Sequence, residues 1–328
     1  MSLAALNTYL EPLRDVLNIE GISEVSINQP GEVWIDQRGK RIRFIKPEVD
    51  LKYLKFLARL VAQSTAQDIS EQKPLLSATL PEGYRIQIIY PPACEADKVI
   101  VSIRKQTIVN LDLDDYEKLG AFDNTLIKAK EDEDKKVLEA LLEGGKIKDF
   151  IKQAVKRRKN IIVSGGTSTG KTTFMNATLR AIPDEERIIT VEDAREIQLV
   201  QPNKVHLVVS RGGQGIAQVT TQTLIESCLR LAPDRIIVGE LRGAEAFSFV
   251  RAINTGHPGS IATLHADSPK MAIEQLVLML IQADIGLTRG EIIPYLKNVI
   301  DIIVQLKRGE NGNRYVSEIY YNKEKGSF

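Results

Sequence analysis

Residues 165–172 read Gly165-Gly166-Thr167-Ser168-Thr169-Gly170-Lys171-Thr172, which matches the phosphate-binding pattern G-x-x-x-x-G-K-[ST]. Glycines in such a loop let successive backbone N–H groups turn inward and cradle phosphate oxygens. We expect Lys171 to reach the β- and γ-phosphates of a nucleotide and the Thr172 hydroxyl to ligate Mg²⁺. Thr173, the next residue, completes the predicted binding segment.

The residues on either side of this loop strengthen the match. Residues 160–164 form a short apolar run rich in β-branched side chains, which is typical of a buried strand. Residues 173–179 have the pattern of a helix, whose N-terminal dipole would face the phosphates. A strand before the loop and a helix after it argue against a chance run of glycines.

Composition indicates a globular protein with room for two domains. The chain has 328 residues, of which 43% are hydrophobic and 27% charged. A net charge of +1 gives no global field that would favour nucleic acid or an acidic membrane. Cys94 and Cys228 lie far apart, so neither a disulfide framework nor a zinc site is indicated, and a reducing cytoplasm is expected.

The N-terminus lacks the pattern of a signal peptide, and no apolar run approaches the roughly 20 residues that span a bilayer. Membrane contact is therefore expected to be peripheral or through a partner.

The pattern of elements divides the chain into three parts. Residues 1–105 predict a smaller α+β domain, which opens with one amphipathic helix over residues 3–17 and continues with mainly antiparallel strands. Residues 106–147 are charge-rich and predict a linker with helices. From 148 to 328 strands and helices alternate, which predicts an α/β domain with a mainly parallel sheet and a hairpin at its end.

Two later strands of that domain are predicted to end in acids. The run 235–240 is an apolar strand followed by Gly239 and Glu240, and a glutamate there can orient or deprotonate an attacking water. Because Gly239 stands where an aspartate commonly binds Mg²⁺, the metal must depend on Thr172, phosphates and water. Glu192 and Asp193 end another strand, and either could hold metal-bound water or pair with an arginine. Glu192 is the preferred candidate, and the alternative for Asp193 is to cap a helix.

Histidines and arginines complete the set of candidate site residues. His265 follows a strand near the predicted triphosphate and could sense the γ-phosphate, His257 is a weaker candidate, and His206 is expected to be structural. Arginines can neutralise charge that develops in phosphoryl transfer. Spacing alone does not choose among the candidates, which are Arg85, Arg104, Arg195, Arg230 and Arg242.

Four motifs in this order resemble the type II/IV secretion ATPase family. They are the phosphate loop, the acidic motif at 190–196, the nucleotide motif at 229–243 and the histidine motif at 255–266. Residues 83–105 further resemble the N-terminal domain of the VirB-type branch, which powers type IV secretion and conjugation. One mild departure is Thr169, where a serine is usual.

The resemblance implies a ring-shaped homohexamer of cytoplasmic ATP hydrolases with a RecA-like P-loop C-terminal domain. It implies that ATP, with Mg²⁺, sits between the two domains. By position, Arg85 and Arg104 match arginines that contact nucleotide phosphates, and Glu240 matches the catalytic glutamate. Expected partners are inner-membrane components of a secretion channel, with peripheral attachment to the membrane, and a secreted protein or DNA substrate that is contacted indirectly.

Three other functions remain open from the sequence. A pilus-retraction or type II secretion ATPase would share the C-terminal motifs, although two distant cysteines exclude the four-cysteine module of type II assembly enzymes. A nucleotide-gated scaffold with slow hydrolysis is a second alternative, against which Glu240 argues. A ring helicase is the third, and the near-neutral charge makes it less attractive.

Overall fold

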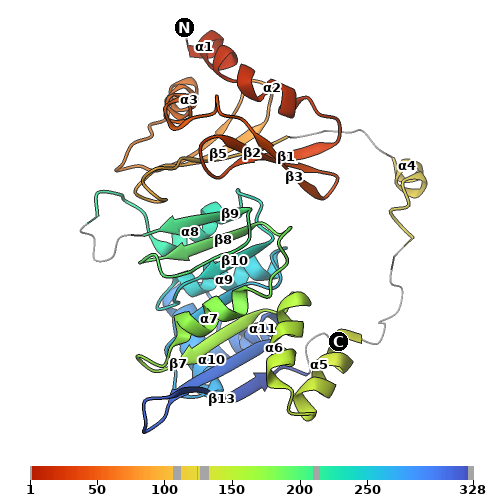
Figure 1. Ribbon diagram of the computed structural model, residues 1–328, viewed down its shortest axis with the longest axis vertical. Helices are drawn as coiled ribbons and strands as arrows, with labels where there is room; N and C mark the ends of the chain where they lie inside the picture. Colours follow the sequence, from red (N-terminus) through yellow and green to blue (C-terminus); the bar gives the residue numbers. More distant parts are fainter. Residues whose placement is uncertain (1, 106–111, 124, 126–132, 210–214, 324–328) are drawn as a thin grey trace.

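A computed structural model describes residues 2–105, 112–123, 125, 133–209 and 215–323. Two sheets organise these residues, and Figure 1 places the N-terminal sheet above the C-terminal one. The helices are α1 (Ser2–Tyr9), α2 (Glu11–Leu17), α3 (Leu51–Ser64), α4 (Leu113–Lys118), α5 (Glu133–Glu143), α6 (Ile147–Lys156), α7 (Lys171–Leu179), α8 (Thr221–Cys228), α9 (Glu245–Asn254), α10 (Pro269–Gln282) and α11 (Arg289–Val299). The strands are β1 (Ile22–Ile27), β2 (Glu32–Gln37), β3 (Lys40–Ile45), β4 (Leu75–Thr79), β5 (Arg85–Ile89), β6 (Ile100–Arg104), β7 (Ile161–Gly165), β8 (Ile188–Glu192), β9 (Lys204–Val208), β10 (Arg235–Val238), β11 (Ile261–Leu264), β12 (Ile302–Arg308) and β13 (Arg314–Tyr321).

The N-terminal sheet is antiparallel, in the order β3-β2-β1-β6-β5-β4, which confirms the predicted α+β domain. Helices α1, α2 and α3 pack on it through a shared leucine-rich core. The opening helix is two helices rather than the one predicted, because a proline ring at Pro12 would clash with a carbonyl one turn earlier. Strand β4 was not predicted, since its five residues at the sheet edge carry little periodic signal.

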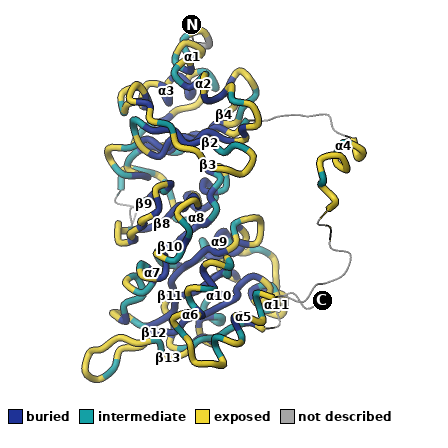
Figure 2. Tube along the Cα trace, turned by 45° about the vertical axis from the view of Figure 1, so that its right-hand side comes forward, coloured by how far each residue is buried: buried dark blue, intermediate teal, exposed yellow. Residues whose placement is uncertain are grey.

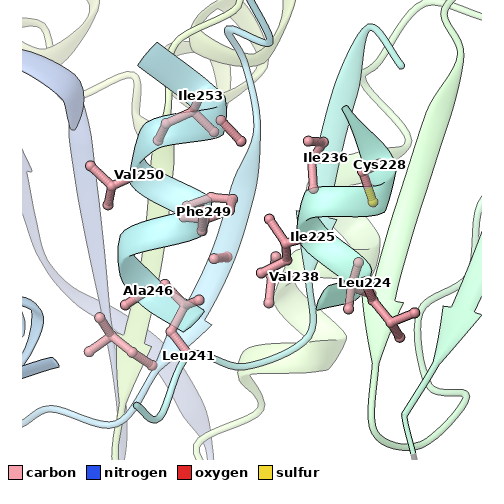
Figure 3. Packing of buried hydrophobic residues seen from close by; sticks show 14 of the residues in the cluster. Leu224, Ile225, Cys228, Ile236, Val238, Leu241, Ala246, Phe249, Val250 and Ile253 are labelled. Carbon is pink, nitrogen blue, oxygen red and sulfur yellow. The ribbon is translucent and has the colours of Figure 1, made fainter. Parts of the chain in front are cut away.

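The C-terminal sheet has the order β13-β12-β7-β11-β10-β8-β9, and every neighbouring pair is parallel except the β12–β13 hairpin. Helices α5, α6 and α7 share a core with one side of the strands, and α8 to α11 share a core with alternate residues of the same strands. Figure 3 shows Phe249 of α9 and Ile225 of α8 in the second core, with Val238 of β10 between the two helices. This arrangement confirms the predicted α/β domain and places the carboxyl ends of β7, β8, β10 and β11 along one edge.

The two domains meet through buried polar groups. Arg187 is fully buried and donates from Nη1 to Asn28 of the first domain (2.6 Å) and to Asn203 of the second (2.7 Å). Burial lowers the pKa of Arg187 to about 10, with Glu24 acting in the opposite sense. A β-bridge between Cys94 and Leu207 adds a backbone contact. The N-terminal domain therefore rests on the β8–β9 side of the C-terminal sheet (Figure 1).

Within the segment predicted as a linker, the two helices differ in surroundings. Helix α4 has no buried residue and stands apart from both sheets (Figure 2). Helix α5 packs on α6, and Leu138 joins the C-terminal core beside Phe150. A helix from the predicted linker thus contributes to the core of the C-terminal domain.

A buried ion pair at the amino ends of β8 and β10 gives a stability prediction. The Arg235 side chain is fully buried, and Glu186 accepts from its Nε (2.6 Å) and Nη2 (2.9 Å). Glu186→Ala leaves this guanidinium without its counter-ion, so we expect a loss of about 3–5 kcal/mol in the free energy of unfolding of the C-terminal domain. Chemical denaturation measures it, with the exposed Glu185→Ala as control. Equal midpoints for the two variants would contradict the role of the pair.

Candidate nucleotide-binding site

The phosphate loop joins β7 to α7, as the sequence predicted. Gly170 precedes the helix with a φ of +85°, a conformation that side chains with a Cβ rarely adopt. A Cβ on Gly165 would lie 2.8 Å from the carbonyl oxygen of Leu306 on β12. Both glycines are therefore required by the backbone, one for its dihedral angle and one for the close approach of the neighbouring strand.

Lys171 lies across the loop. Its ammonium donates to the carbonyl oxygens of Gly165 (3.0 Å) and Gly166 (3.1 Å) and lies 3.4 Å from both ring nitrogens of His265. Burial lowers the pKa of Lys171. The ammonium is therefore held by neutral oxygen and nitrogen atoms, and an arriving phosphate would supply the negative charge that stabilises it.

Glu240 and His265 come from adjacent strands and meet beside the loop. Glu240 follows β10 and His265 follows β11, and Nε2 of the imidazole lies 2.5 Å from Oε1 of the carboxylate. Arg242 also pairs with Glu240 and reaches Asp193 at 3.4 Å. Burial, followed by the charge of Lys171, lowers the pKa of His265, so the imidazole is neutral at pH 7. A carboxylate thus faces the loop lysine across a neutral histidine.

Glu192 is the buried anchor of the turn that follows β8. Its carboxylate accepts from Nη1 of Arg195 (2.8 Å) and from the backbone amides of Glu196 (2.8 Å) and Ile197 (2.7 Å). Of the two roles predicted for Glu192, the structure has the pairing with an arginine. The same bonds fold the chain back so that Oε2 of Glu196 accepts from the Thr172 hydroxyl at 3.1 Å.

His206 belongs to the same buried network, as its structural assignment predicted. Its Nδ1 lies 2.9 Å from the Thr190 hydroxyl and 3.7 Å from Glu192. Burial alone would raise the pKa of Glu192, but hydrogen bonds, first that of His206, outweigh it and the pKa is lowered. Glu192 is therefore charged at neutral pH.

One cavity of about 580 Å³ joins these groups. It is lined by Thr167, Ser168, Thr169, Gly170, Lys171, Thr172, Thr173, Glu192, Asp193, Ala194, Glu196, Ile197, Gly239, Glu240, Arg242, Thr263, His265 and Arg314. All of them belong to the C-terminal domain. The structure thus brings together the predicted loop, both acids and His265.

The oxygen ligands around Thr172 suit Mg²⁺ bound together with a nucleotide. Within the described ranges, no group of three or more histidines, cysteines or acids could hold a metal by itself. Mg²⁺ commonly keeps several waters and takes only one or two protein oxygens beside substrate phosphates. The Thr172 hydroxyl, with the Glu196 carboxylate 3.1 Å away, matches such a donor set.

Arg85 and Arg104 lie outside the phosphate-loop cavity. They face each other across the β5–β6 ladder and line a second pocket, of about 340 Å³, together with Arg230 from the loop after α8. Arg104 also contacts the buried Glu24 at 3.4 Å. No residue lines both this pocket and the phosphate-loop cavity. Within one chain the predicted arginines and the predicted phosphate loop are thus not brought together.

The remaining assignments concern His257, the candidate Arg242, and two residues that the sequence did not predict, Glu196 and Arg314. His257 is half-buried and bonds to the carbonyl oxygen of Pro233, so it lies outside the cavity. Arg242, one of the five candidate arginines, lines the cavity. Glu196 also lines it, and its place within the acidic motif at 190–196 is the sequence signal that points to it. Arg314 carries no sequence signal, because only the sheet order brings β13 to the loop.

Comparison with known proteins agrees with this geometry. The family model described as type II/IV secretion system protein matches residues 7–311. The chain belongs to this secretion family. The type IV secretion system protein VirB11 of Bartonella quintana is 40% identical, with 98% of this chain and 94% of that protein covered. PtlH of Bordetella pertussis, also named a type IV secretion system protein, is 36% identical over 97% of this chain and 95% of its own.

A solved structure supports the same placement within the secretion family. The crystal structure of the VirB11 ATPase from the Brucella suis type IV secretion system, in complex with sulphate, matches with a TM-score of 0.93 and 38% identity. It covers 98% of this chain and 95% of that one. This member of the secretion family is therefore a VirB-type secretion ATPase in fold and sequence. Among the helices that the structure describes, none has the length and apolar character needed to cross a membrane.

Proposed function

We propose that this chain hydrolyses ATP to power substrate translocation or pilus assembly by a bacterial type IV secretion or conjugation system. The observation that carries the proposal is the single cavity in which the phosphate loop, Glu240 and His265 meet. The names of the VirB11 and PtlH relatives supply the secretion context. Release of phosphate from ATP, dependent on Mg²⁺ and on the intact loop, is the direct test.

In the proposed mechanism the chain's own residues do the following. Loop amides bind the α- and β-phosphates, and Lys171 leaves its carbonyl partners for the β- and γ-phosphates. Thr172 holds Mg²⁺, which neutralises phosphate charge when bound. Glu240 accepts a proton from the attacking water. Neutral His265, 2.5 Å from the Glu240 carboxylate, orients that carboxylate.

The proposed assembly is a homohexameric ring in which the arginine pocket of one copy meets the nucleotide of its neighbour. The support is geometric: Arg85, Arg104 and Arg230 converge on one pocket, whereas the cavity of the same chain is lined by the C-terminal domain alone. Loss of the γ-phosphate then weakens the contact between copies and moves domains. The solution mass should rise to that of a hexamer with ATP; a monomer at all nucleotide concentrations would contradict the ring.

Arg104→Ala should lower ATP turnover at least tenfold, because a guanidinium that meets developing phosphate charge is lost. Arg38→Ala is the matched control, since Arg38 is an exposed arginine of the same domain that pairs only with Glu20 among the residues described. Steady-state phosphate release measures both variants. Unaltered turnover of Arg104→Ala would refute its role.

Mixing two variants that are each impaired in hydrolysis tests which copy supplies the arginine. In a ring of Arg104→Ala and Lys171→Ala chains, an intact loop and an intact arginine pocket meet at some subunit contacts. If the arginine acts on the neighbour's nucleotide, the mixture regains turnover that neither variant has alone. If it acts on the nucleotide of its own chain, no activity returns, and the proposed contact between copies is wrong.

We also propose that the protein works at the inner face of the cytoplasmic membrane, attached to inner-membrane components of the channel. The support is the secretion-system role that the names of its relatives give. Copurification with membranes only when the channel components are present would agree with this location.

A further inference from the structure

Arg314 lies at the start of β13 and reaches over the phosphate loop from the side opposite Glu240. Its Nε donates to the carbonyl oxygen of Ser168 at 3.2 Å. Its Cδ lies so close to the loop that a Cβ on Gly170 would come within 2.8 Å of it. The β12–β13 hairpin therefore contacts residues 168–170 of the phosphate loop, which we call the loop crest.

The hairpin also touches the beginning of the loop. In the parallel ladder of β12 and β7, Leu306 pairs with Gly165. The carbonyl oxygen of Leu306 would lie 2.8 Å from a Cβ placed on Gly165. Two loop glycines thus have close neighbours from the hairpin: Gly165 contacts β12, and Gly170 contacts Arg314. The loop conformation, including Ser168 with a φ of +60°, is supported from this one side.

The positive charge of the Arg314 guanidinium is not neutralised by its hydrogen bond to the loop. Arg314 is exposed and lines the cavity with Lys171 and Glu240. Among the described residues, no carboxylate pairs with it and only its Nε has a hydrogen-bond partner. An arginine left with its Nη groups open in an anion-binding cavity is suited to a phosphate or to the face of a base.

Sheet order decides which end of a nucleotide it would meet. Glu240 and His265 follow β10 and β11, on one side of β7, whereas Arg314 comes from beyond β12 on the other side. A nucleotide with its γ-phosphate beside Glu240 must direct its α-phosphate and nucleoside away from that acid. The end that remains lies toward β12 and β13.

We propose that Arg314 is a nucleotide-binding residue that contacts the α-phosphate end of ATP and steadies the loop crest through Ser168. The inference rests on the proposed ATP binding and adds a residue that lies beyond the family match at 7–311. Arg314 acts on binding and not on the bond that is cleaved. ATP and ADP share the end it contacts, so both should depend on it equally.

The test compares Arg314→Ala and Arg314→Lys with Arg308→Ala, which removes the exposed arginine paired opposite Arg314 in the hairpin. Calorimetric titration of the full chain should give Kd values for ATP and ADP that rise by the same factor, roughly tenfold, in Arg314→Ala. KM should rise similarly with kcat within about twofold, a single charge-assisted contact having been lost. Arg314→Lys should recover part of the affinity, and Arg308→Ala should bind as the unaltered chain does.

Any other outcome contradicts either the role of Arg314 or the proposed ATP binding on which that role rests. Wild-type affinity of Arg314→Ala for both nucleotides would remove Arg314 from the site, as would a fall in kcat at unchanged KM. A larger loss for ATP than for ADP would place the guanidinium at the γ-phosphate instead. If the unaltered chain binds no ATP, the proposed function itself fails, whatever the variants do.

Discussion

Lys171→Ala should abolish ATP hydrolysis, with turnover reduced by a factor of about 10³ or more. The ammonium has two neutral carbonyl partners, on Gly165 and Gly166, and burial lowers its pKa. A triphosphate would replace weak neutral contacts by charged ones, so the lysine gains most when nucleotide binds. Removing it takes away the charge that reaches both the β- and the γ-phosphate.

The loss should not come from unfolding. Because the pKa of Lys171 is lowered in the folded chain, its charged form is disfavoured there relative to the unfolded chain, and this cost is present below the lowered pKa. Lys171→Met, which keeps the bulk of the side chain, should therefore melt no earlier than the unaltered protein at neutral pH. Thermal melting and phosphate release, measured on the same samples, separate the two effects.

Lys156→Ala, on the exposed end of α6, provides the matched control and should retain full turnover. Substantial hydrolysis by both Lys171→Ala and Lys171→Met would refute the phosphate loop as the site of ATP hydrolysis.

The sequence predicted the parts of this site that local patterns encode. The loop at 165–172 contains its own instructions, because the glycines, the lysine and the flanking strand and helix all stand within 20 or so residues. Glu240 and His265 could be predicted because parallel strands bring their carboxyl ends to one edge. Their 2.5 Å contact follows from the adjacency of β10 and β11.

What could not be predicted depends on sheet order and on burial. Arg314 is 142 positions after Thr172 by their numbering, and only the placement of β12 beside β7 brings its strand to the loop. For Glu192 the sequence left two roles open, holding metal-bound water or pairing with an arginine, and only the buried hydrogen bonds of its carboxylate to Arg195 and to backbone amides decide for the second. In the proposed ring, the position of Arg104 relative to a nucleotide would be set by a neighbouring copy, which no local pattern reveals.

Glu240→Gln should separate binding from chemistry. The amide has nearly the same shape but cannot take a proton from water, so ATP hydrolysis should fall by about 10²–10⁴ while ATP affinity stays within a few-fold. Glu240 pairs with Arg242 and His265, whereas the loop amides that would bind phosphate belong to a different segment of the cavity wall. Single-turnover phosphate release and nucleotide titration measure the two quantities independently.

Glu274→Gln makes the same chemical change on α10, where Glu274 pairs with Arg289 at the surface, and should leave turnover unaltered. Because Glu240→Gln holds ATP without cleaving it, the solution mass of this variant with ATP should remain that of the assembled ring long after the unaltered protein has exhausted its nucleotide. If Glu240→Gln instead hydrolyses ATP as fast as the unaltered chain, the acid is not the base. If the unaltered chain itself hydrolyses ATP as slowly as Glu240→Gln is expected to, the protein is a nucleotide-gated scaffold and the motor is excluded.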